Sequence, residues 1–126
     1  MPARGDFDVV DMKPWLGNMN LVDVERNPLD FRYRVFGTNV ANMLRKELTG
    51  HTIDDNPLSL VAQLRASYER VVETAAPFYQ RIDFVAVSEF YRFHRLLLPL
   101  SDDDKAVTQV LVGNTPIKEE LALCLE

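Results

Sequence analysis

The second half of the chain holds three strand-like segments with no room for a helix between them. Residues 77–84 read PFYQRIDF, residues 89–100 read EFYRFHRLLLPL and residues 106–114 read AVTQVLVGN, all rich in aromatic and branched side chains. The last two are joined only by the acidic turn SDDDK. Parallel neighbours need a crossover of a dozen or more residues, so these strands are predicted to pair antiparallel.

A further pair of antiparallel strands is predicted near the start of the chain. NLVDVE at 20–25 is strand-like, and the turn RNPLD leads from it directly into FRYRVFG at 31–37. A period of two places Phe31, Tyr33 and Val35 on the core face, and Arg32 and Arg34 on the opposite face.

A short helix is predicted immediately after this second strand. Apolar residues recur there at helical spacing, at Val40, Met43 and Leu44. Thr38 or Asn39 is expected to cap the start of the helix, and Gly50 to supply a left-handed exit. The strand therefore leads into a helix that folds back over it.

The following amphipathic helix has the clearest pattern in the sequence. Asn56 is the expected cap, Pro57 the first helical residue, and Pro77 the stop, which gives about five turns. Its apolar stripe consists of Leu58, Val61, Leu64, Tyr68, Val71 and Val72. Such a helix is expected to lie on a sheet.

Two strands, a helical block and three further strands indicate an α+β fold with an antiparallel sheet. We expect one domain over residues 1–126, since 126 residues suffice for a single core. Residues 1–18 are expected to form a helical or turn cap. Residues 116–126 are expected to form a C-terminal helix, started by Thr115 and Pro116, that needs a surface to dock on.

In this order the segments resemble a PAS domain, and more closely the single-domain PAS_5 type of alphaproteobacteria. The stretches that carry the resemblance are PARGDFDVVDM, LVDVERNPLDFRYRVFGT, ELTGHTIDD and LLLPLSDDDKAVTQVLVG. It implies a five-stranded antiparallel sheet in the order 2-1-5-4-3, with helices over one face that often enclose a small-molecule pocket. Members of that type tend to have glycine where Arg45 and Asp104 stand here, which bears on local turn geometry.

Composition excludes several classes of function. The formal net charge is -5, with acidic and basic residues interleaved, so a nucleic-acid partner is not expected. An apolar run long enough to span a membrane is missing, as is the apolar stretch of a signal peptide, so we expect a cytoplasmic protein with no membrane partner. The single cysteine, Cys124, excludes an internal disulfide.

No cofactor, metal or catalytic group is predicted. Flavin-binding PAS domains of the light-sensing type need a cysteine in the helical block, and residues 39–76 have none. Haem would need an axial histidine, but His51 is expected in an exposed turn and His94 as a hydrogen-bonded structural residue of its strand. Asp102, Asp103 and Asp104 lack the ligand spacing of a calcium loop and predict a solvated turn.

Two features leave alternatives open. Arg32, Arg34, Arg92 and Arg95 could fork onto a carboxylate or phosphate ligand at a cavity mouth, or could pair on the solvent face with Asp23 or Glu25. The final strands are apolar on both faces, so the second face of the sheet must be covered by the terminal helices or by a second copy of the chain. We favour a homodimer.

The function predicted is that of a non-catalytic sensory or regulatory module that binds a small apolar or amphipathic ligand, a signalling protein, or both. The candidate ligand-binding residues chosen by strand parity and helix stripe are Tyr33, Val35, Met43, Leu44, Leu60, Leu64, Phe93 and Gln109. His94 is added to them for the chemistry of its imidazole. The first alternative is a constitutive interaction module with a filled core and no ligand. The second is a small enzyme with a carboxylate or His94 as general base, for which the sequence offers no orienting partner.

Overall fold

The computed structural model describes residues 1–3, 17–56, 60–86 and 88–116. The strands are β1 (Met19–Glu25), β2 (Asp30–Phe36), β3 (Phe78–Ala86), β4 (Glu89–Leu100) and β5 (Gln109–Pro116). Between β2 and β3 lie helix α2 (Thr38–Leu44), the 3-10 helix η3 (Ile53–Asp55) and helix α3 (Val61–Thr74).

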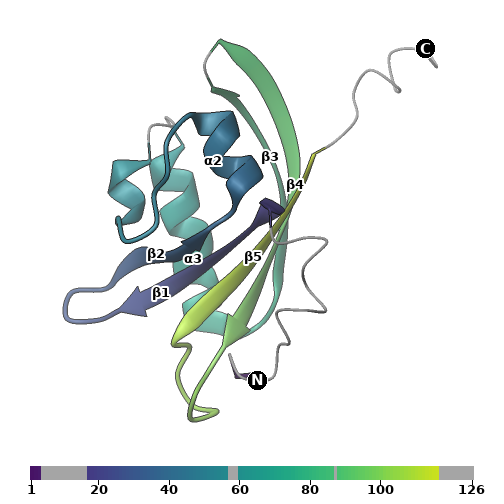
Figure 1. Ribbon diagram of the computed structural model, residues 1–126. Helices are drawn as coiled ribbons and strands as arrows, with labels where there is room; N and C mark the ends of the chain where they lie inside the picture. Colours follow the sequence, from purple (N-terminus) through teal and green to yellow (C-terminus); the bar gives the residue numbers. More distant parts are fainter. Residues whose placement is uncertain (4–16, 57–59, 87, 117–126) are drawn as a thin grey trace, which may run out of the picture.

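The strands form one antiparallel sheet in the order β2-β1-β5-β4-β3. Figure 1 shows α2 and α3 together over one face of this sheet. The predicted fold class, strand order and placement of the helices are therefore confirmed. We call the face under the helices the inner face and the opposite one the outer face.

A bulge in β2 overturns the predicted alternation of that strand. Leu21 of β1 pairs with Val35, whereas the next residue, Val22, pairs with Tyr33, so Arg34 is the extra residue. An extra residue moves everything beyond it to the other face. Val35, predicted to be in the core, is consequently 42% exposed, and Phe36 is 5% exposed in its place.

The turn from β2 into α2 depends on the absence of a side chain at Gly37. A Cβ there would lie 2.5 Å from the backbone oxygen of Gly17 and 2.7 Å from that of Met19. Gly37 itself is the N-cap residue, and α2 has no side-chain cap, so the expected capping by Thr38 or Asn39 is wrong.

Both helices end in left-handed residues, and the one that ends α2 is not the predicted Gly50. Arg45, with φ of 54°, ends α2, and Ala75, with φ of 51°, ends α3. Gly50, the predicted exit, also has a positive φ, but it lies in a later turn, where its N–H donates to the carbonyl oxygen of Tyr33 at 2.7 Å. Arg45 and Asp104, where the resemblance implies glycine, are both left-handed.

Helix α3 begins later than predicted. Its N-cap is Leu60, while Asn56 ends η3 and turns its side chain into the core. Pro57 and Leu58 lie outside the described residues. The apolar stripe still faces the sheet, because Leu64, Tyr68 and Val71 are buried as predicted.

The main core fills the space between the helices and the inner face. Phe31, Leu48, Ile53 and Leu97 are among its most completely buried side chains. A smaller cluster lies on the outer face and consists of the buried residues Leu21, Leu100 and Leu111 with the partly buried Met19 and Leu98.

Apolar side chains are also exposed on the outer face of the β3–β4 hairpin. They are Tyr79 and Leu96, which are paired in register, and Val85 and Phe90, which are also paired. The predicted apolar character of both faces of β4 is thus present, and the homodimer stays a prediction.

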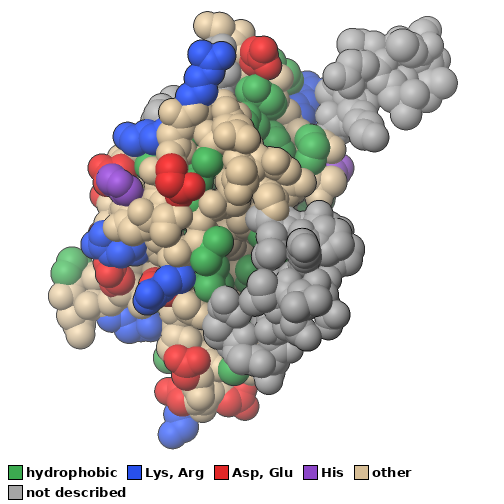
Figure 2. Space-filling view, in the orientation of Figure 1, with side chains coloured by type: hydrophobic (Ala, Val, Ile, Leu, Met, Phe, Trp, Pro, Cys, Tyr) green, Lys and Arg blue, Asp and Glu red, His purple; other side chains and the backbone are tan. Residues whose placement is uncertain are grey.

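The surface carries charges of both signs. Figure 2 shows acidic and basic side chains interleaved over the side formed by β2 and the helices, with the exposed acidic turn between β4 and β5 at one end. Arg32 pairs with Glu25 at 3.0 Å and Arg34 with Asp23 at 2.9 Å, which confirms the solvent-face reading for these two arginines.

Few of the described residues belong to the two ends of the chain, so most predictions for these segments are not compared with the structure. The N-terminal cap and the C-terminal helix fall mostly outside the described residues. Thr115 and Pro116, predicted to start that helix, belong to β5, where Pro116 pairs with Phe93 of β4. Within the described ranges no helix is long and apolar enough to cross a membrane.

Candidate ligand-binding site

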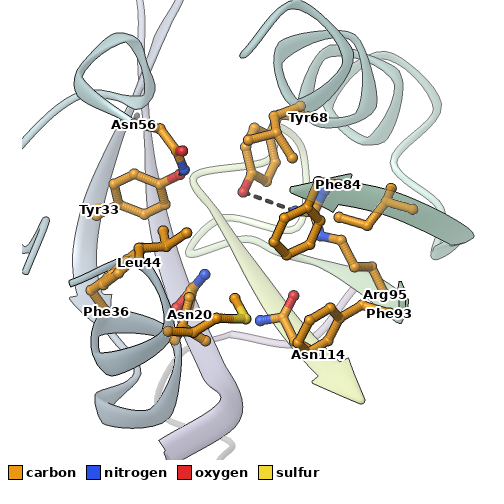
Figure 3. Close-up of a pocket in the computed structure, with 14 residues that line it drawn as sticks. Asn20, Tyr33, Phe36, Leu44, Asn56, Tyr68, Phe84, Phe93, Arg95 and Asn114 are labelled. Atoms are coloured by element: carbon orange, nitrogen blue, oxygen red, sulfur yellow. Dashed lines mark hydrogen bonds between the residues drawn. The ribbon is translucent and has the colours of Figure 1, made fainter. Parts of the chain in front are cut away.

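A cavity of about 40 Å³ lies between the two helices and the inner face of the sheet. Figure 3 shows side chains from β1, β2, α2, α3 and the last three strands converging on it. The lining residues are Asn20, Tyr33, Phe36, Val40, Met43, Leu44, Asn56, Leu64, Tyr68, Ile82, Phe84, Phe93, Arg95 and Asn114.

Most of the wall is apolar, and its aromatic rings contact one another in pairs. Phe36 meets Tyr33 edge to face, with ring centroids 4.9 Å apart, and Phe84 stacks on Phe93 at 5.6 Å. Such aromatic pairs are held in one arrangement by their quadrupoles as well as by burial. Val40 and Leu44 close the cavity from α2, and both are buried. The bulge in β2 matters here, because it turns Phe36 inward.

Arg95 brings a positive charge into this apolar wall. It is only 3% exposed, and its two terminal nitrogens donate to the side-chain oxygen of Gln80 at 2.9 Å and to the hydroxyl of Tyr68 at 3.0 Å. Its guanidinium also lies 5.5 Å from the centre of the Tyr68 ring. Among the described residues, none of the ion pairs includes Arg95.

Two asparagines add amide groups from neighbouring strands. The buried Asn20 accepts a hydrogen bond from the Gly37 N–H at 3.0 Å through its side-chain oxygen, which fixes the orientation of the amide and leaves its NH₂ group as donor. Asn114 of β5 donates to the carbonyl oxygen of Asn18 at 3.0 Å. In Figure 3 Asn20 and Asn114 lie at the opposite end of the cavity from Asn56 and Tyr68.

The hydroxyl of Tyr33 lies at the end of the cavity where η3 stops. Asn56 donates to it at 3.2 Å. Burial raises the pKa of Tyr33 well above its ordinary value, and the neighbouring Tyr68 raises it further. Tyr33 is therefore a neutral phenol at physiological pH, and it does not offset the charge of Arg95.

Five of the nine predicted site residues line the cavity. They are Tyr33, Met43, Leu44, Leu64 and Phe93. Strand parity and the helix stripe located them correctly, because no bulge intervenes at Tyr33 or Phe93.

The other four predicted residues lie elsewhere. Val35 points outward because of the bulge at Arg34, and Leu60 packs against the core without reaching the cavity. His94 is exposed on the outer face, where its Nδ1 contacts the hydroxyl of Tyr79 and its ring stacks on that tyrosine. Gln109 donates to the Asp23 carboxylate at 2.8 Å and is held there.

The polar part of the site was predicted only through Arg95, which was one of four arginines with two interpretations left open. Arg95 shares the parity of Phe93 and Leu97, and this was the available signal that it points inward. Arg92, on the opposite face of β4, pairs with Asp83 at 3.3 Å. The same signal was available for both asparagines, since Asn20 shares the parity of the buried Val22, and Asn114 that of the buried Val112.

Metal-ligating and acid–base side chains do not cluster at the cavity in the described part of the chain. No group of three or more metal-ligating side chains occurs there. His51 is exposed as predicted, and its Nδ1 lies 3.0 Å from a carboxylate oxygen of Asp55 in the same turn. The cavity lining contains neither a histidine nor a carboxylate among the described residues.

Solved structures of other proteins share the fold of this chain. No protein-family model and no curated protein matches the chain. The solved PAS domain of BvgS from Bordetella pertussis is 15% identical, with a TM-score of 0.66, and the match covers 93% of each chain. A light-oxygen-voltage domain studied with a flavin analogue is 10% identical, with a TM-score of 0.65 over 93% of this chain and 89% of that one.

VqmA of Vibrio cholerae is a third similar structure. It is 8% identical, with a TM-score of 0.66, and the match covers 90% of this chain but 53% of VqmA, so this chain spans about half of that protein. Identities this low establish the fold alone, and the alphaproteobacterial type stays a prediction. Strand order, helix placement and these matches agree with the resemblance seen in the sequence: the chain has the PAS fold.

Proposed function

We propose that the chain is a non-catalytic sensory module that binds a small amphipathic molecule in the cavity under α2 and α3. The observation that carries the proposal is the lining itself, in which a mostly apolar wall meets a few buried polar groups. This combination is typical of small-molecule sites, where apolar surface supplies affinity and convergent polar groups supply orientation. Among solved structures with this fold, VqmA has been captured bound to DPO.

The size of the cavity limits what it can hold. Ligand pockets usually measure about 300–1,000 Å³, whereas this cavity of about 40 Å³ has space for roughly three water molecules. The proposed ligand is therefore a molecule of a few non-hydrogen atoms. Catalysis is not proposed, because the described lining offers no general base.

Native mass spectrometry of the protein purified from its own host tests this function. Extra mass that disappears on denaturation identifies the ligand. Val40→Phe should fill the cavity and lose that mass, whereas the matched change Val35→Phe, on the outer side of β2, should keep it. A protein that is free of extra mass in every spectrum, or a Val40→Phe variant that keeps it, contradicts the proposal.

For the output we propose a homodimer through the outer face of the β3–β4 hairpin. Tyr79, Val85, Phe90 and Leu96 are exposed there in two cross-strand pairs, which make an apolar surface suited to self-association. Phe90→Asp should shift sedimentation equilibrium toward monomer. Leu29→Asp, at an exposed apolar residue of the β1–β2 turn, is the matched control and should leave the dimer intact. A ligand-free dimer would favour the alternative of a constitutive interaction module.

A further inference from the structure

We infer that the ligand is a small monocarboxylate whose carboxylate binds Arg95 and whose short apolar tail lies against Phe36 and Leu64. This inference rests on the function proposed above and names the chemical class of the ligand. It predicts one anionic group and one apolar end in the same small molecule.

The first argument is charge. An ionised group buried without a partner of opposite charge is unfavourable, and proteins ordinarily pair such groups. Even the more exposed arginines Arg32, Arg34 and Arg65 have a partner of opposite charge, because each contacts a carboxylate. Among the described arginines only Arg95 is buried, and none of the ion pairs between described residues includes it. A bound anion would supply the missing charge.

The second argument is the excess of hydrogen-bond donors. A guanidinium carries five N–H groups and accepts nothing, and two of the hydrogen bonds of Arg95 go to Gln80 and Tyr68. These are the two hydrogen bonds that the described residues make with Arg95, so its other N–H groups are available to a ligand. The amide of Asn20, whose oxygen is occupied by the Gly37 N–H, adds further donors at the lining. An ionised carboxylate accepts only, so it matches this set better than an alcohol or an amide does.

The third argument concerns the number of charges and the size. Among the described lining residues Arg95 alone is charged, which suits one negative charge rather than the two of a phosphate monoester. Most of the other lining residues are apolar, and they would exclude a second ionised group. The cavity of about 40 Å³ then limits the tail to a few carbon atoms.

The test compares sodium butyrate with its neutral counterpart butyramide at pH 7, both titrated into the full chain and followed by ¹H–¹⁵N NMR in constant chloride. Butyrate should bind at least tenfold more tightly than butyramide, because only butyrate can pair with the guanidinium. The shifted resonances should include the Arg95 side chain and the Gly37 amide. Equal affinities for the two compounds overturn the inference.

Three variants sharpen this comparison. Arg95→Met should weaken butyrate binding at least tenfold and leave butyramide unchanged. Arg92→Met, the same change on the opposite face of the same strand, should leave both affinities unchanged. Arg95→Lys keeps the charge, so it should bind butyrate more tightly than Arg95→Met does. Should Arg95→Met fail to fold, the lysine variant and the butyrate–butyramide comparison still decide the matter.

The outcomes separate this inference from the proposed function. If butyramide, or a neutral molecule identified by native mass spectrometry, binds in the cavity and butyrate does not, the carboxylate inference is wrong and the sensory function stands. If neither probe shifts the resonances of cavity residues, and the purified protein also carries no extra mass, both fail together.

Discussion

Truncating two adjacent residues of β2, Phe36 and Val35, tests the bulge that shapes the cavity. Phe36 is 5% exposed and contacts Tyr33 edge to face, so Phe36→Ala should lower the free energy of unfolding by about 3–5 kcal/mol. Val35 leaves 42% of its surface in water, so Val35→Ala should lower it by about 1 kcal/mol or less. The predicted gap between the two variants is therefore at least about 2 kcal/mol.

Equilibrium unfolding in urea measures this gap. For a dependence of about 2 kcal/mol per molar urea, the Phe36→Ala midpoint should lie about 1 M or more below that of Val35→Ala. The slope must stay the same in both variants for the midpoints to be comparable. Strict alternation along β2 predicts the reverse order, with Val35 in the core. A lower midpoint for Val35→Ala would therefore refute the bulge and the placement of Phe36 in the cavity wall.

Three further predictions concern turns. Gly37→Ala should destabilise the protein by about 1–3 kcal/mol, because the new Cβ would meet backbone oxygens of Gly17 and Met19. Gly113→Ala should change the stability little, because a Cβ there has no neighbouring atom within 4 Å. The urea midpoints of the two variants measure this difference. Arg45→Gly should raise the thermal midpoint, since it relieves a left-handed residue, and Lys46→Gly beside it should lower the midpoint. Backbone N–H groups hydrogen-bond the Asp103 carboxylate and hold its pKa below the ordinary value. The ionised carboxylate therefore stabilises the folded protein at any pH above the pKa that Asp103 has in the unfolded chain. This stabilisation is lost as the pH falls through the lower pKa of the folded state. Asp103→Asn should accordingly lower the urea midpoint at pH 7, and this difference should shrink as the pH falls below about 4. A difference that stays constant as the pH is lowered through that range would contradict this assignment.

The fold could be predicted from the sequence because its strongest signals are local. Short connections made the last three strands antiparallel, and the stripe of Leu64, Tyr68 and Val71 placed α3 on the sheet. The order of the strands is not local information, and it came from the resemblance to PAS domains. Helix starts were less predictable, since Asn56 satisfies the rules for a cap but bonds to Tyr33 instead.

The candidate site was predictable only for its apolar part. Parity located Phe93 correctly, but FRYRV reads as unbroken alternation, and only pairing with β1 reveals that Arg34 is an extra residue. His94 was retained for its chemistry although its parity is opposite to that of Phe93. Arg95 was left between two interpretations, because an inward arginine contradicts the usual preference of charge for water. Two departures from ordinary rules thus shape this cavity: the bulge turns Phe36 inward, and the inward Arg95 brings a charge.

The hydrogen bonds of Arg95 also have a consequence for how this sequence can diverge. Arg95 on β4, Tyr68 on α3 and Gln80 on β3 satisfy one another across three elements. Replacing Arg95 alone with an apolar residue would take a partner from both Tyr68 and Gln80, which costs more than changing the group together. Relatives of this chain should therefore vary these three positions jointly, with an apolar residue at 95 accompanied by a phenylalanine at 68. A lineage that kept Tyr68 and Gln80 after losing the arginine would have to supply another donor at the same place.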